Sequence, residues 1–128
     1  MIAYIPLTNV FAEIKKQSWN AESSTAYFSS SINAKNGSYL IGQYHDWIIQ
    51  VKDKRGHAVN NAKIKMSGGM MAHGHGLPSQ PLITRYLGEG NYLIEGVLFN
   101  MPGDWTLLFN ITAPAYKDHV RFDVTLNN

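Results

Sequence analysis

The strongest constraint on this chain is a two-residue alternation of apolar and polar side chains that recurs from about residue 23 to the end. Successive side chains of a β-strand point to opposite faces, so this alternation predicts strands with one buried face and one solvated face. The clearest apolar sets, each alternating with other residues, are Trp47, Ile49 and Val51; Ala62, Ile64 and Met66; Trp105, Leu107, Phe109 and Ile111; and Val120, Phe122, Val124 and Leu126.

Short polar or glycine-rich turns separate these runs. They include Asn36-Gly37, Gly88-Glu89-Gly90 and Pro102-Gly103-Asp104, and the second predicts a tight hairpin. Segments 24–32, 39–44, 82–87 and 91–99 have weaker alternation but favourable strand composition. No convincing helix follows residue 23. We therefore predict an all-β fold, an antiparallel immunoglobulin-like sandwich of about seven strands, with a small barrel as the main rival.

The size and charge of the chain set further limits. Its 128 residues suit one domain, which we expect over residues 23–128, preceded by an N-terminal extension over 1–22. A net charge of +2 argues against nucleic-acid binding. The absence of cysteine excludes disulfides, thiol nucleophiles and cysteine-bound metals. No apolar run reaches the roughly 18–20 residues that span a bilayer.

The N-terminal extension is apolar but does not resemble a secretory signal. Pro6, Asn9 and Glu13 interrupt it, and Lys15 and Lys16 follow the apolar part instead of preceding it. Either the protein remains inside the cell or the chain is a mature form. The apolar residues of 1–14 predict packing against the domain or against a partner chain.

The most unusual segment is 67–81, in which we expect a long irregular loop because it contains several glycines and two prolines. The loop holds two of the five histidines and two of the five methionines, namely His73, His75, Met70 and Met71. Imidazole is the commonest protein metal ligand. Two residues apart in an extended stretch, the two histidine rings should leave on the same side. The segment is therefore a candidate metal site.

The methionines indicate which metal such a site would prefer. Thioether sulfur together with imidazole suits copper, above all Cu(I), better than calcium, magnesium or zinc. Met101, at another turn, is a further sulfur candidate. His45 could supply a third imidazole, and the neighbouring Asp46 carboxylate could orient that ring by a hydrogen bond without binding the metal itself. The predicted ligand set is therefore His73, His75, Met70, Met71, Met101 and His45.

Plainer interpretations compete with this one. Methionines in a sandwich usually fill core gaps, which is our expectation for Met66. A His-x-His pair can lie in a solvated turn or order a loop by bonding to its backbone. We expect His57, in a turn, and His119, on the wet face of a strand, to be ordinary surface residues.

Several motifs resemble those of the YtkA-like and FixH-like group of small bacterial domains, over about residues 38–126. The motifs are Tyr44-His45-Asp46-Trp47, the run from Gly69 to Pro78 with its His-Gly-His-Gly-Leu-Pro, Leu87-Gly88-Glu89-Gly90-Asn91-Tyr92, and Asn100-Met101-Pro102-Gly103-Asp104-Trp105. The resemblance implies an immunoglobulin-like sandwich that is exported to the periplasm or cell surface. It also implies a link to copper handling or to respiratory-oxidase assembly.

Enzyme functions fit the sequence poorly. A cupin-like site would need a glutamate soon after His75, whereas the first downstream acid is Glu89. Nothing marks Asp104 and Asp118 as a catalytic pair, and no Gly-x-Ser-x-Gly motif is present. We therefore expect a non-catalytic protein.

A protein-interaction module is the alternative to metal binding. Immunoglobulin-like domains often only bind other proteins. Early aromatic residues could face a partner, and the extension could add a strand to a neighbour or mediate self-association. The tyrosines concerned are Tyr4, Tyr27, Tyr39 and Tyr44.

Overall fold

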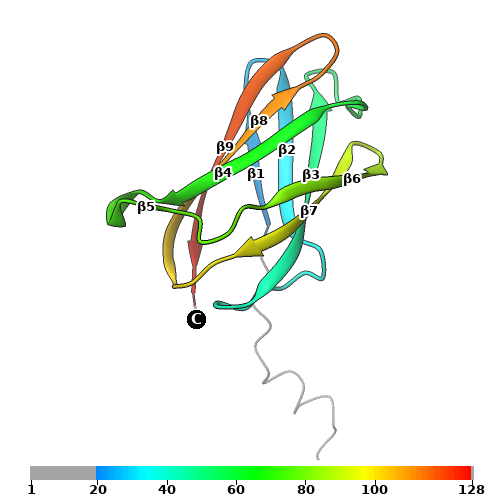
Figure 1. Cartoon of the computed structure of the whole chain (residues 1–128). Helices are drawn as coiled ribbons and strands as arrows, with labels where there is room; N and C mark the ends of the chain where they lie inside the picture. The colour runs from blue at the N-terminus through cyan, green and yellow to red at the C-terminus, as the bar shows by residue number, and fades with distance from the viewer. Residues whose placement is uncertain (1–19, 128) are drawn as a thin grey trace, which may run out of the picture.

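The computed structural model describes residues 20–127, which form two antiparallel sheets packed face to face (Figure 1). The five-stranded sheet has the order β1-β2-β3-β7-β6, and the four-stranded sheet has the order β5-β4-β8-β9. The fold is the predicted all-β sandwich. Its strands are β1 (Asn20–Ser24), β2 (Phe28–Ala34), β3 (Tyr44–Asp53), β4 (Lys63–Met70), β5 (His75–Gly76), β6 (Leu82–Gly88), β7 (Asn91–Leu98), β8 (Gly103–Thr112) and β9 (Lys117–Leu126).

Nine strands replace the expected seven for two reasons. The run at 24–32 divides into β1 and β2, which pair with each other through a turn, and the two-residue β5 was not foreseen. β1 begins at Asn20, so the last residues of the expected extension belong to a sheet. The expected packing of residues 1–14 lies outside the described residues.

The expected strand at 39–44 is wrong, because only Tyr44 belongs to a strand, β3. The backbone there is satisfied in other ways. Nε2 of His45 lies 2.8 Å from the Leu40 carbonyl oxygen, which can only accept a hydrogen bond, and the Gly42 N–H donates to the Phe99 carbonyl at 2.7 Å. The positive φ of Gly42, 83°, turns the chain before β3 begins.

The expected irregular loop at 67–81 is also wrong in its first half. β4 continues to Met70, a single 3-10 turn, η1 (Met71–His73), follows, and β5 folds back to pair with β4. Glycine permits this strand instead of breaking it. A Cβ atom at Gly69 would clash with the His75 carbonyl, and one at Gly68 would clash with the Thr106 carbonyl. The glycines therefore let β5 and β8 approach β4 closely.

The core lies between the sheets and is built from the alternating apolar positions. β9 shows the pattern most clearly, with Val120, Phe122, Val124 and Leu126 buried and their neighbours largely exposed. Trp47 of β3 and Trp105 of β8 are both almost fully buried. Met66 is partly buried against the core, as expected, and His57 and His119 are on the surface, as expected.

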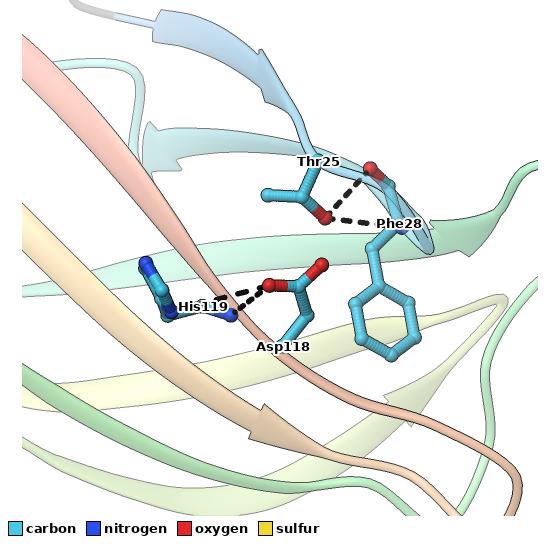
Figure 2. A network of polar contacts seen from close by, with 4 residues as sticks. All are labelled: Thr25, Phe28, Asp118 and His119. Atoms are coloured by element: carbon cyan, nitrogen blue, oxygen red, sulfur yellow. Dashed lines mark hydrogen bonds and ion pairs between the residues drawn. The ribbon is translucent and has the colours of Figure 1, made fainter.

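Two sets of local polar contacts lie side by side at the β1–β2 turn and the start of β9 (Figure 2). The Thr25 hydroxyl accepts a hydrogen bond from the Phe28 N–H at 3.2 Å, which closes the β1–β2 turn. The Asp118 carboxylate accepts a hydrogen bond from the His119 N–H at 2.8 Å. This bond comes first among the causes that lower the pKa of Asp118, and the Thr25 side chain lowers it further. None of the described helical segments is long and apolar enough to cross a membrane.

Candidate metal site

The β4–β5 hairpin carries the candidate ligands at one side of the sandwich (Figure 1). Met70 and His75 are directly opposed across its antiparallel ladder, and Gly69 opposes Gly76. Between them, η1 ends at Gly74 in the left-handed conformation, with φ 67° and its N–H bonded to the Met71 carbonyl. His73 therefore lies in a turn and not in the extended stretch that the sequence suggested.

The hairpin nevertheless brings the two imidazole rings together. The ring centroids of His73 and His75 are 6.0 Å apart and the ring planes are inclined by 28°. Two imidazoles that share one ion at a metal–nitrogen distance of about 2.0–2.1 Å have centroids about 5–6 Å apart. Both side chains are exposed to solvent. The spacing is therefore suitable for a shared ion at the surface.

A backbone contact defines the tautomer of His75. Its Nδ1 lies 3.0 Å from the Gly76 carbonyl oxygen, which can only accept a hydrogen bond. When Nδ1 carries the proton and donates it there, Nε2 keeps a free lone pair. Histidines that bind metals commonly donate their second N–H to a carbonyl or carboxylate in this way.

The methionines occupy three different environments. Met70 is only 1% exposed, and Met71, the next residue, is 67% exposed. Met101 is partly buried against the core. Directly opposed residues of an antiparallel pair share one face of the sheet, so the Met70 thioether is on the same face as the His75 ring. Met70 is therefore the sulfur ligand best placed beside His75.

Trp105 joins this group, although the sequence identified it only as a core residue of a strand. Its ring centroid lies 5.8 Å from that of His75, and the two planes make an angle of 73°. Its indole N–H donates to the Met101 carbonyl at 3.2 Å. Its place four residues after Met101 in the Met-Pro-Gly-Asp-Trp turn was the only signal that could have suggested this role.

His45 and Asp46 are not brought to the hairpin. Nε2 of His45 lies 2.8 Å from the Leu40 carbonyl oxygen, and its ring is 6.1 Å from that of Phe99. Phe99 in turn contacts Trp105 at 5.1 Å, so two aromatic rings separate His45 from His75. Within residues 20–127, the Asp46 carboxylate makes no hydrogen bond to His45 that would orient it.

The remaining charged groups give no conventional metal site. In the described part of the chain, no group of three or more His, Cys, Asp or Glu residues is arranged to hold an ion. The hairpin thus offers two imidazoles, a thioether and an indole ring. This set lacks the oxygen ligands that calcium and magnesium require.

The tyrosines considered for a partner surface also differ among themselves. Tyr27 and Tyr44 are exposed, and Tyr27 stacks on Tyr116 with centroids 4.6 Å apart. Tyr39 is buried, which removes it as a contact residue, and its hydroxyl accepts a hydrogen bond from the Asn127 N–H at 3.0 Å. Tyr4 lies outside the described residues.

Comparison with known proteins gives one match. A family model described as YtkA-like matches residues 20–108, which covers β1 to the middle of β8 and includes the entire hairpin. No curated protein and no solved structure matches the chain.

Proposed function

The chain belongs to the YtkA-like family, and on that premise we propose that it is a non-catalytic, exported domain that binds a soft transition metal, copper, through the β4–β5 hairpin. His73 and His75 supply the nitrogen ligands and Met70 supplies sulfur. The observation that carries the proposal is the pairing of His75 Nδ1 with the Gly76 carbonyl, beside a second imidazole at 6.0 Å.

The mixed ligand set supports copper over other metals. Thioether sulfur is a soft ligand that favours Cu(I), whereas zinc sites use thiolate, imidazole and carboxylate. The register that opposes Met70 to His75 gives the site its sulfur from a rigid strand and not from a loop. Two further methionines are candidates for a second sulfur ligand. Met71 lies in the η1 turn of the hairpin, and Met101 lies in the turn before β8.

Exposure of the site supports a role in carrying the metal. His73, His75 and Met71 are all accessible to solvent, so a partner could reach an ion held there. The resemblance to exported domains linked to copper handling or respiratory-oxidase assembly supports an accessory role outside the cytoplasm. Nothing in this proposal requires a reaction at the site.

A competition titration tests the proposal. The affinity for Cu(I) is measured against a chelator of known affinity for the native chain and for His73→Ala/His75→Ala. The matched control is His57→Ala/His119→Ala, because both of these side chains are more than two-thirds exposed and lie away from the hairpin. We expect the first variant to lose at least about tenfold in affinity and the control to lose none. Equal affinity in all three proteins removes the hairpin from any copper site.

A second candidate function is a protein-interaction module, favoured by the exposure of Tyr44 (69%) and Leu40 (50%) at the start of β3. Large apolar side chains gathered at the surface are typical of interfaces. In this function the chain would self-associate through its N-terminal extension. Deletion of residues 1–14 should then lower the number of chains per particle, obtained by light scattering as the particle mass divided by the chain mass, and an unchanged number counts against self-association.

A further inference from the structure

Trp105 occupies a fixed position relative to the proposed ligands. β4 and β8 pair antiparallel, with Gly69 opposite Thr106 as the last pair, so Trp105 comes one step further, beside Met70. Met70 in turn opposes His75 of β5. Three adjacent strands therefore present an imidazole, a thioether and an indole in one row, which runs from the exposed edge strand β5 to the buried strand β8.

The indole ring is held rigidly in that row. Its N–H is bonded to the Met101 carbonyl, and Phe99 packs against it at a ring angle of 64° with centroids 5.1 Å apart. Only 1% of Trp105 is exposed. A side chain that is fixed by packing and by a hydrogen bond is pre-organised, so it needs no reordering when a cation arrives.

The face of an indole ring attracts cations within about 6 Å of its centroid, and this attraction is strongest where water is excluded. The His75 ring lies edge-to-face with this indole, with centroids 5.8 Å apart, so an ion bound on the side of the imidazole that faces Trp105 comes within this range. A divalent ion such as zinc prefers to complete its coordination with further nitrogen or oxygen ligands or water. The described residues provide no third such ligand at the hairpin.

We propose that Trp105 forms one wall of the hairpin metal site and makes the site selective for monovalent Cu(I) over divalent zinc. The inference rests on the proposed function, since it names the residue that decides which ion the same site prefers. Trp105 acts by presenting its ring to the ion, and Met101 and Phe99 are the positioning residues that hold the ring in place.

The test compares Cu(I) and Zn²⁺ affinities of the native chain, Trp105→Phe and Trp105→Leu. Loss of the indole should weaken Cu(I) binding by about 2- to 30-fold, more for leucine than for phenylalanine, and should weaken zinc binding less, because zinc keeps water ligands between its charge and the ring. A general loss of structure would weaken the binding of both ions to the same extent. The ratio of the two affinities therefore separates selectivity from packing.

A spectroscopic measurement keeps the test valid if the leucine variant fails to fold. In Trp19→Phe/Trp47→Phe the only tryptophan left is Trp105, and Cu(I) should quench its fluorescence with the same midpoint as binding. Addition of His73→Ala/His75→Ala should abolish this quenching. If the native chain binds no Cu(I), the proposed function and this inference both fail. If Cu(I) binds with unchanged Trp105 fluorescence and an unchanged affinity ratio in Trp105→Phe, the function stands and this inference is overturned.

Discussion

Gly103 leaves room for the methyl group of Met70: a Cβ atom at position 103 would lie 2.7 Å from Cε of Met70. This relationship joins two segments more than 30 residues apart, the glycine-rich hairpin and the turn that leads into β8. Together with the φ of 126° at Gly103, it favours glycine at the centre of the Met-Pro-Gly-Asp-Trp turn. The end of the side chain proposed as a ligand lies against that glycine.

Gly103→Ala should therefore destabilise the protein and displace Met70. The new methyl group meets Met70, and the φ of 126° at this position is unfavourable for alanine. We expect a loss of about 1–3 kcal/mol in the free energy of unfolding, measured with denaturant. The control is Gly37→Ala, where φ is 73° but nothing lies within 4 Å, so only backbone strain is added. An equal loss in both variants would show that contact with Met70 is unimportant.

Met70→Leu should separate the sulfur of Met70 from its packing. Leucine has a similar volume, so the free energy of unfolding should fall by less than about 1.5 kcal/mol. The affinity of the Met70→Leu variant for Cu(I) should fall clearly, because the thioether has been removed. Met71→Leu is the matched control at the exposed neighbour and should change stability little. Retention of full Cu(I) affinity by Met70→Leu would exclude Met70 as a ligand.

Asp118 should make folding stability sensitive to acid. Its pKa in the folded protein is below the usual 3.8, first because the His119 N–H donates to it. The unfolded chain therefore takes up the proton more readily. The stabilisation is present above the unfolded pKa and is lost as the pH falls through the folded pKa. Between about pH 5 and about pH 2, the denaturant midpoint of Asp118→Asn should fall less than that of the native chain.

The same slope in Asp118→Asn and the native chain would contradict this assignment. Asp53 provides a second instance, since its pKa is also lowered, mainly by the His57 N–H at 2.9 Å. Asp53→Asn should reduce the acid sensitivity in the same direction. The two sites lie in different turns, so their effects should add.

Tyr92→Phe should destabilise the sandwich through one lost hydroxyl. That hydroxyl donates to the Val59 carbonyl at 2.7 Å and accepts from the Ala62 N–H at 3.1 Å. Burial raises the pKa of Tyr92, which keeps the phenol protonated as a donor. We expect a loss of about 1–3 kcal/mol, because two partners are left unsatisfied. Tyr86→Phe also removes a hydroxyl with two partners, since it donates to Asn60 and accepts from the Gly90 N–H, but at a half-exposed tyrosine water can replace it and the cost should be smaller. An equal or larger loss there would refute this explanation.

The sequence by itself determined the fold class, the strands from β6 to β9, and the core faces of β8 and β9. The alternation in β9 and the Gly88-Glu89-Gly90 hairpin are local signals, because side-chain direction in a strand and the conformation of a turn depend on neighbouring residues. Such local signals did not predict the hairpin at 67–76. Its glycines looked like loop residues, and only the neighbouring strands show that they make room for β5 and β8.

Only the tertiary structure decided which candidate ligands meet. The sequence indicated one group of candidate ligands because they are close along the chain, namely His73, His75, Met70 and Met71. It did not indicate that Met70 is buried and Met71 is exposed. It included His45, which the fold places two aromatic rings away, and it missed Trp105 as a neighbour of His75. Contacts between strands depend on register and sheet order, which long-range packing sets and which no local pattern encodes.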